Sequence, residues 1–349
     1  MPEQDIQALR AECDLATKFW GRIWAGFTAI VFREKGEEAA KRFMVLSLGN
    51  HQSGHYLEGL RKLGIRDDEP PAVRAAKYHY LSNAMGGLNM EYIEESPKKV
   101  WIRYLAPSWA YPGVAMMALP SSIRKGGAEA WHAKNGALMG CPRLGWVSTK
   151  SIMDMEPYDE GYFIEYDHDL APGESYRIEP AVRTPEFDPS KQPRLDPAVW
   201  PEARLLKAQR NLMRQYFRTA VEVLFRMYGE QYTYFLVSQV MRGVAIQFTH
   251  ELKREMGIEA TDAKAVAEFH YNLQRASSQE VQLTPSRDMH SVILRSHLPF
   301  GPENDELRAA RFEFTSMATR LISGRVSVVR KLDGEAEIWE FCNAGRWLW

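Results

Sequence analysis

His51 and His55 lie four residues apart in a segment expected to be helical, so both imidazoles occupy one helix face, one turn apart. Two such nitrogens could share a metal ion or act as an acid–base pair. No glutamate follows the first histidine, as a zincin-type zinc motif would require. We therefore expect His51 or His55 to act as an acid–base group. Metal binding by the two histidines is a further alternative that the spacing leaves open. The alternative is a hydrogen-bonded structural pair.

Two further candidates for chemistry are His132 and Cys141. The cysteine follows a predicted helix in a Met-Gly-Cys-Pro sequence, and it would be a nucleophile if a neighbour such as His132 ionised its thiol. However, the dipole at the C-terminal end of a helix opposes a thiolate, and a lone cysteine is more often a small buried apolar group. His132 and Asn135 are three residues apart on the same predicted helix, so they can face one pocket.

Aromatic residues surround these positions in the sequence and could form the floor of a ligand site. The alternative is that they belong to the hydrophobic core, where aromatic side chains at strand and helix spacing are common. The candidate ligand-binding residues are the aromatic Trp101, Trp109, Tyr111 and Trp131, together with Asn135 of the predicted helix. An acidic group nearby, at residues 154–160, is most simply a solvated turn, and the alternative is a site for a hard cation. The sequence contains no phosphate loop, dinucleotide fingerprint or paired Cys-x-x-Cys motif, so no nucleotide cofactor is expected.

The elements that would position these residues follow from hydrophobic periodicity and from glycine and proline breaks. Three helices are expected at 6–34, 37–63 and 72–85, followed by a hairpin at 89–105, a helix at 127–139 and a strand pair at 146–168. Prolines every four residues then mark a stiff linker at 183–203. The order repeats with helices at 202–227, 230–256 and 262–274, a hairpin at 279–297, a helix at 307–322 and a hairpin at 324–341.

This repetition predicts an internal duplication, because Gly36 and Gly64 recur as Gly229 and Gly257 with no gap between them. The expected fold is α+β, with two copies of one domain packed as a pseudo-dimer. The first repeat would be residues 1–182, the linker 183–203 and the second repeat 204–349.

The two copies differ in polarity at the candidate positions. His51 and His55 correspond to Val244 and Phe248, so the histidines are expected on a buried face and the site in the first repeat. The second repeat would be mainly structural.

The closing segment 332–342 has a Gly-acidic turn followed by a short strand with Phe and Cys. Together with the element order, it resembles a tandem duplication of the domain shared by bacteriochlorophyll 4-vinyl reductases and transport-protein-particle components. It is also similar to the 2-aminothiazoline-carboxylate hydrolase-like family. This resemblance implies the same α+β fold. It also implies either the binding of an apolar or tetrapyrrole ligand or the hydrolysis of a small heterocycle.

Composition limits the function classes. The 349 residues include 44 basic and 45 acidic side chains, which gives no broad electrostatic reason to bind nucleic acid or an anionic membrane. No apolar run approaches a membrane span, and the three cysteines form no disulfide framework. With no signal peptide at the N-terminus, a cytoplasmic location is expected. Homo-oligomerisation is left open.

The function we expect is a hydrolase or lyase acting on a cyclic or aromatic small molecule, with His acid–base chemistry in the first repeat. The alternative is a non-catalytic binding or sensory protein for an apolar or aromatic ligand. A protein-binding scaffold is a third interpretation.

Overall fold

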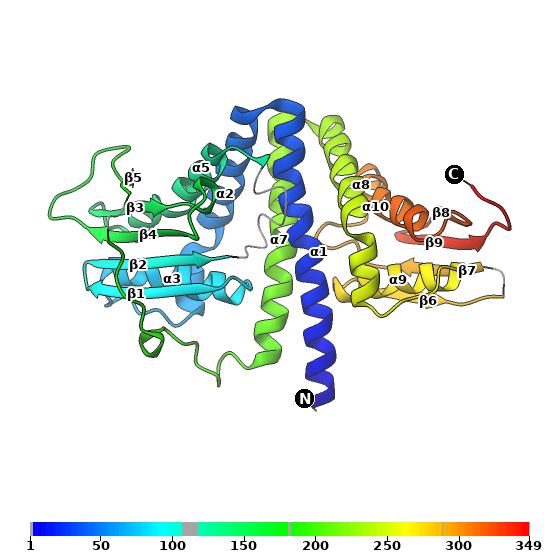
Figure 1. Cartoon of the computed structure of the whole chain (residues 1–349), viewed down its shortest axis with the longest axis horizontal. Coiled ribbons are helices and arrows are strands. Elements are labelled where there is room, and N and C mark those ends of the chain that lie inside the picture. The colour runs from blue at the N-terminus through cyan, green and yellow to red at the C-terminus, as the bar shows by residue number, and fades with distance from the viewer. Residues whose placement is uncertain (1–2, 107–117, 181–182, 288, 349) are drawn as a thin grey trace. The chain divides into compact units, whose positions relative to one another are not determined.

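The computed structural model describes residues 3–106, 118–180, 183–287 and 289–348 and has an α+β fold (Figure 1). The chain forms two compact units. We call residues 31–209 the central unit, and residues 1–30 together with 210–349 the split unit. Across the described ranges, no helix is long and apolar enough to cross a membrane.

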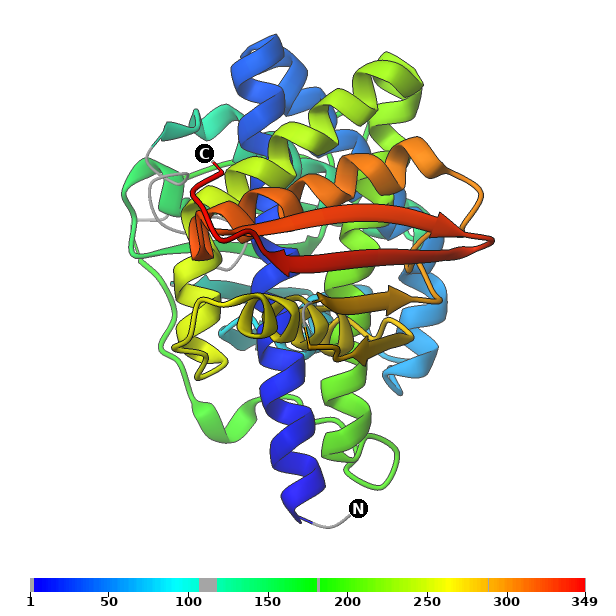
Figure 2. The ribbon, with the colours of Figure 1, turned by 90° about the vertical axis from the view of Figure 1, so that its right-hand side faces the viewer.

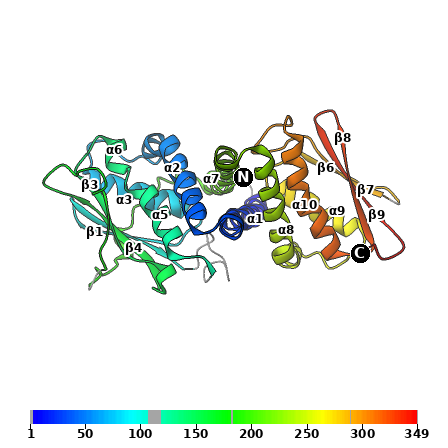
Figure 3. The same ribbon diagram turned by 90° about the horizontal axis from the view of Figure 1, so that it is seen from above.

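The central unit has a five-stranded sheet in the order β1-β2-β4-β3-β5, in which only β3 and β5 pair in parallel. Its helices pack on one side of this sheet (Figure 3). Its helices are α2 (Glu37–Lys62), α3 (Pro71–Met85), α5 (Ser121–His132) and α6 (Asn135–Met139). Its strands are β1 (Met90–Ser96), β2 (Lys99–Leu105), β3 (Leu144–Lys150), β4 (Tyr158–Glu165) and β5 (Tyr176–Ile178), and short 3₁₀ turns occur at Ile152–Asp154 and Pro189–Lys191.

The split unit has an antiparallel sheet in the order β6-β7-β9-β8, seen face-on in Figure 2. It contains α1 (Glu3–Lys35) up to Ile30 and α7 (Glu202–Tyr228) from Arg210 onward. Its other helices are α8 (Glu230–Glu255), α9 (Ala263–Ala276) and α10 (Asp305–Ile322). Its strands are β6 (Val281–Thr284), β7 (Met289–Leu294), β8 (Val326–Asp333) and β9 (Ala336–Asn343).

Most predicted elements are confirmed, because their signals are local. Gly36, for example, has a φ of 83°, a conformation that glycine adopts without a steric penalty, and it separates α1 from α2 as expected. The linker is largely extended and packs on the sheet of the central unit: Arg103 Nη2 donates to the Pro185 carbonyl at 2.7 Å. The compact units place residues 1–30 with the second half of the chain. Compact units do not show whether two segments are related in sequence. The boundaries of the two repeats therefore remain a prediction.

Two local predictions were wrong. The helix expected at 127–139 begins at Ser121 and ends at His132, with a separate short helix after it. Gly126 and Gly127 lie inside this helix because α5 approaches α2 closely: a Cβ at 127 would come within 2.9 Å of the Met44 side chain. The acidic turn is also wrong at its end, since Glu160 lies in β4 and is buried.

The core of the central unit lies between the sheet and α3. Its buried apolar side chains include Val100 and Ile102 of β2, Trp146 of β3 and Phe163 of β4. His132 lies on this same side of the sheet, against Trp146 and Phe163.

Candidate functional site

His132, the last residue of α5, is fixed by two hydrogen bonds. Its Nδ1 donates to the Ala128 carbonyl at 2.6 Å, and its Nε2 accepts from the Tyr104 hydroxyl at 2.9 Å. Burial lowers the pKa of His132 to about 3, mainly through loss of solvation. His132 is therefore a neutral imidazole at physiological pH.

The imidazole of His132 lies between two other rings. It stacks on Trp146 with ring centroids 4.0 Å apart and on His79 at 4.5 Å. His79 Nε2 accepts from Asn135 Nδ2 at 2.6 Å, and Asn135 Oδ1 accepts in turn from the Gln52 side chain. Burial holds the pKa of His79 well below its usual range. The result is a buried polar chain from α2 through α6 to α3.

His51 and His55 differ in environment. His51 is buried and stacks on Trp131 at 5.8 Å, whereas His55 is exposed, with its ring centroid 5.2 Å from that of His51. The expectation of a shared buried face is therefore wrong for His55, because α2 turns this position toward solvent. Burial, followed by the nearby charge of His55, lowers the pKa of His51 to about 3.

The described residues contain no group of three or more His, Cys, Asp or Glu side chains placed to hold a metal ion. His51 and His55 supply two nitrogens at most. A metal at this pair would need its remaining ligands from elsewhere, and a structural zinc site normally uses four protein ligands.

A small polar pocket adjoins His132 in the central unit. Its walls include Tyr104, and Arg124 Nη2 and Asp159 Oδ2 form an ion pair there at 2.7 Å. The pocket has a volume of about 20 Å³, which suits one water molecule. Lys150 also reaches its rim.

Cys141 is not part of this group. It is buried in the apolar cluster beside Leu144, and no hydrogen bond joins it to His132 within the described ranges. One side of Cys141 borders an open hollow of about 400 Å³ whose walls are mainly small and apolar, including Pro142 and Leu170. In the part of the chain that the structure describes, no base is hydrogen-bonded to the Cys141 thiol, as a cysteine nucleophile would need.

The predicted aromatic site is only partly assembled. Trp131 contacts His51 and His79, but Trp101 lies on the opposite face of the sheet from Tyr104, because neighbouring strand positions alternate. The Trp101 indole donates to Glu95 at 2.6 Å. Trp109 and Tyr111 lie outside the described residues. The structure thus brings together His51, Trp131, His132 and Asn135, and leaves Trp101 and Cys141 apart. His55 lies beside His51 but is exposed to solvent.

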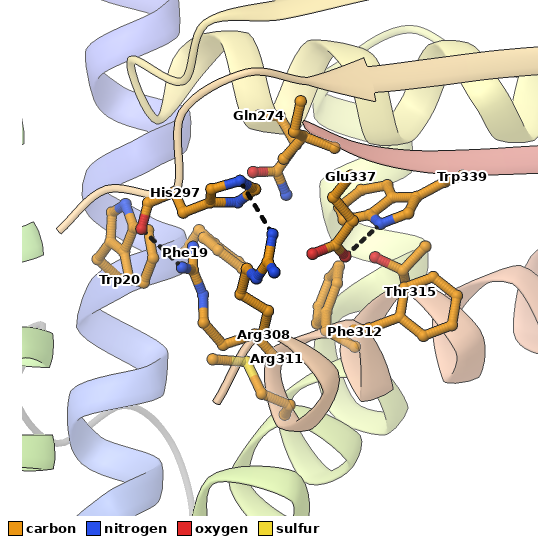
Figure 4. A pocket seen from close by; sticks show the side chains of 13 residues that line it. Phe19, Trp20, Gln274, His297, Arg308, Arg311, Phe312, Thr315, Glu337 and Trp339 are labelled. Carbon is orange, nitrogen blue, oxygen red and sulfur yellow. Dashed lines mark hydrogen bonds between the residues drawn. The ribbon is translucent and has the colours of Figure 1, made fainter. Parts of the chain in front are cut away.

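A second pocket, in the split unit, was missed by the sequence reasoning (Figure 4). It combines polar side chains of α9, α10, β9 and the segment after β7 with aromatic walls, and its volume is about 30 Å³. The polar residues are Gln274, His297, Arg308, Arg311, Thr315 and Glu337, and the aromatic residues are Phe19, Trp20, Phe312, Phe314 and Trp339. Arg308 and Arg311, three residues apart on one face of an amphipathic helix, were the available signal.

Arg311 is held by backbone carbonyls. Its Nη1 donates to the His297 carbonyl at 3.0 Å and its Nη2 to the Leu298 carbonyl at 3.1 Å. Loss of solvation lowers the pKa of Arg311 to about 10, with Glu337 acting in the opposite direction and the charge of Arg308 adding to the decrease. Arg311 remains charged at neutral pH, in surroundings that disfavour its charge.

No protein-family model, curated protein or solved structure matches this chain. The function must therefore be argued from the two pockets themselves.

Proposed function

We propose that the protein is a non-catalytic binding or sensory protein that takes a small aromatic ligand in the pocket of the split unit. The observation that carries this proposal is the convergence of Arg308, Arg311 and His297 inside walls that include Phe19 and Trp20. Apolar walls with a few convergent polar groups are typical of small-molecule sites.

The size of the pocket limits how the ligand enters. A volume of about 30 Å³ holds roughly two water molecules, so the larger part of a ligand must displace side chains. Phe312 is only partly buried, unlike Trp20 and Phe314, and is the wall residue best placed to move. Ligand binding would then be coupled to a local rearrangement of α10, which suits a sensor.

Native mass spectrometry with metal analysis of the purified protein tests this function. We expect an organic molecule to co-purify without stoichiometric metal, or aromatic acids added to the protein to change the fluorescence of Trp20 and Trp339. Arg308→Gln should weaken this binding, while Arg242→Gln, at an exposed ion pair with Glu313, should not. Absence of both a co-purifying molecule and any response to aromatic ligands would reject the proposal.

A second candidate is a hydrolase or lyase acting on a cyclic or aromatic substrate in the central unit. The Tyr104–His132 hydrogen bond at the edge of a polar pocket with Arg124 and Asp159 favours it. It ranks second because both ring nitrogens of His132 are already hydrogen-bonded and its pKa of about 3 makes it a weak base.

Single variants test the enzyme. Substitution of His51, His55, His132 or Cys141 should abolish turnover of the substrate in at least one case. Four fully active variants would reject acid–base or nucleophilic chemistry at these residues. A stoichiometric metal lost in a His51→Ala/His55→Ala variant would instead favour a metalloenzyme.

We also propose that the two halves arose by duplication of one domain, as in the families that the sequence resembles. Several parallels support this. The sheet orders β1-β2-β4-β3 and β6-β7-β9-β8 follow one pattern, and Gly36 and Gly229 both precede a helix with positive φ. His79 and His270 are both fully buried on the third helix of the repeat to which each would belong. The pseudo-dimeric arrangement belongs to the same proposal.

A reducing compartment such as the cytoplasm is proposed as the location of the protein. The support is that Cys141 and Cys342 are free thiols.

A further inference from the structure

The polar side of the split-unit pocket carries more positive than negative charge among the described residues. Arg330 pairs with Asp305 and, at 2.9 Å, with Glu337. Arg308 reaches Asp305 at 3.5 Å. Arg311 has no carboxylate within ion-pair distance in the described chain. Two carboxylates thus stand beside three guanidinium groups, and Arg311 is the one that forms no ion pair among the described residues.

Arg311 also has hydrogen-bonding capacity left over. A guanidinium has five N–H donors, and the described hydrogen-bond partners of Arg311 are the two carbonyls of His297 and Leu298. The Arg311 guanidinium also lies over the Phe217 ring, 5.7 Å from its centroid. Figure 4 shows Arg311 beside Arg308 and His297 at one side of the pocket. The buried Arg214 adds positive charge nearby, which also lowers the pKa of Arg311. An anion placed here would relieve this repulsion and supply acceptors.

The protein's own buried carboxylate is already engaged. Glu337 accepts a hydrogen bond from the Trp339 indole at 2.7 Å and forms an ion pair with Arg330. A bound ligand can therefore supply an acceptor that Glu337 does not. A carboxylate matches the planar fork of a guanidinium through two parallel hydrogen bonds. Its compact, singly charged head also suits a pocket of about 30 Å³ better than a tetrahedral phosphate does.

We infer that the ligand of the split-unit pocket bears a carboxylate group, that Arg311 is its counterion, and that its aromatic or apolar part packs toward Phe19, Trp20 and Phe312. This inference rests on the binding function proposed above and specifies its ligand class. The ligand class that the pocket would recognise is an aromatic monocarboxylic acid.

Matched pairs of acids and amides test the charge without altering the protein. Benzoate, phenylacetate and indole-3-acetate are titrated into the full chain beside their neutral amides, with binding followed by Trp fluorescence and calorimetry. We expect at least one acid to bind at least about tenfold more tightly than its amide, a difference of about 1.4 kcal/mol. Equal binding of acid and amide would overturn the inference and leave the binding function standing. If no compound binds, both proposals fail.

Inorganic phosphate separates a carboxylate site from a general oxyanion site. Acetate should displace the bound aromatic acid at a lower concentration than phosphate does. The reverse order would reject the carboxylate as the recognised group, while the binding function would stand.

Substitutions then identify the counterion. Arg311→Gln should bring the acid-to-amide affinity ratio close to one, and Arg242→Gln should leave the ratio unchanged. Because Arg311 also holds two carbonyls, thermal unfolding is measured for each variant. If Arg311→Gln does not fold, Arg311→Lys keeps the charge but loses the planar fork, and it should reduce the ratio severalfold. A ratio that is unchanged in a folded Arg311 variant would reject Arg311 as the counterion.

Discussion

The hydroxyl of Tyr104 donates a hydrogen bond to Nε2 of His132 over 2.9 Å, and both residues are buried. Because Nδ1 of the same ring donates to the Ala128 carbonyl, His132 is held as a single neutral tautomer. The imidazole thus bridges β2 and α5 and has no nitrogen left to take a proton from a substrate. This geometry is the main reason that catalysis at His132 ranks below ligand binding.

Tyr104→Phe should lower the free energy of unfolding by about 1–3 kcal/mol, because His132 Nε2 would remain buried without its donor. Urea denaturation monitored by Trp fluorescence measures this change. Tyr162→Phe is the matched control, since no hydrogen bond of its hydroxyl is found in the described chain, and its effect should stay within about 0.5 kcal/mol. Equal effects of the two substitutions would mean that the Tyr104–His132 hydrogen bond does not stabilise the fold.

The buried histidines predict acid sensitivity. His270 in the split unit hydrogen-bonds to Thr319 at 3.3 Å, and burial lowers its pKa to about 3 from an ordinary value near 6.5. The unfolded chain therefore binds a proton that the folded chain does not between these two pH values. The stability that His270 contributes is fully present above about pH 6.5 and is lost as pH falls toward about 3, by up to about 1.4 kcal/mol per pH unit.

His270→Gln should reduce this dependence on pH. The slope of the unfolding free energy between about pH 6 and about pH 5 should be smaller than in the wild type by the equivalent of about one proton. Denaturation at several pH values gives the slope. Gly54→Ala, which changes no ionisable group, is the control and should leave the slope close to that of the wild type. An unchanged slope in His270→Gln would show that this residue is protonated in the folded protein.

Gly161 fixes the position of the Trp146 indole on which His132 stacks. A Cβ at 161 would lie against that indole and within 2.5 Å of the Val147 carbonyl oxygen, and the backbone of a central strand cannot easily move. Gly161→Ala should therefore cost about 1–3 kcal/mol and change the near-ultraviolet circular dichroism of the tryptophans.

Gly54→Ala is the comparison for that variant. Gly54 is exposed within α2, and nothing lies within 4 Å of a Cβ there. Alanine should stabilise the helix by roughly 0.5–1 kcal/mol. If Gly161→Ala and Gly54→Ala changed the free energy of unfolding in the same direction, close packing at Gly161 could not explain the effect of Gly161→Ala.

The sequence predicted the elements well where the signal is local. Periodic apolar residues, the glycine at position 36 and the prolines of the linker each act within a few residues, and the corresponding helices and the extended linker are present. The start of α5 was missed because Gly126 and Gly127 are typical helix breakers in sequence, whereas here they allow close contact with α2. That contact joins segments far apart in the chain, so no local pattern records it.

The candidate site was predicted less completely for the same reason. The spacing of His51 and His55 does indicate neighbouring rings, but it does not determine which ring is buried. The split-unit pocket depends on Trp20 from α1, Arg311 from α10 and Glu337 from β9, which only the tertiary fold brings together. Histidine and cysteine are common catalytic residues, so they were considered first. Paired arginines on a helix are usually solvated, so Arg308 and Arg311 did not indicate a pocket.

The packing of α1 in the split unit predicts how fragments of the chain should behave. Phe19 contacts Phe314 with ring centroids 5.0 Å apart, and Trp20 contacts Phe217 at 5.1 Å. A fragment of residues 204–349, cut at the predicted repeat boundary, would expose these apolar partners. It should bind a hydrophobic dye and unfold without cooperativity, because the core formed with residues 1–30 is missing.

Addition of a peptide of residues 1–30 should restore cooperative unfolding to this fragment, as measured by circular dichroism during heating. The central unit is the control: residues 31–209 contain both the sheet and the helices that cover it, so they should fold without the peptide. A Phe19→Ala/Trp20→Ala peptide should fail to rescue, because the ring contacts supply much of the buried apolar area. Cooperative folding of residues 204–349 alone would show that α1 is not required for the core of the split unit.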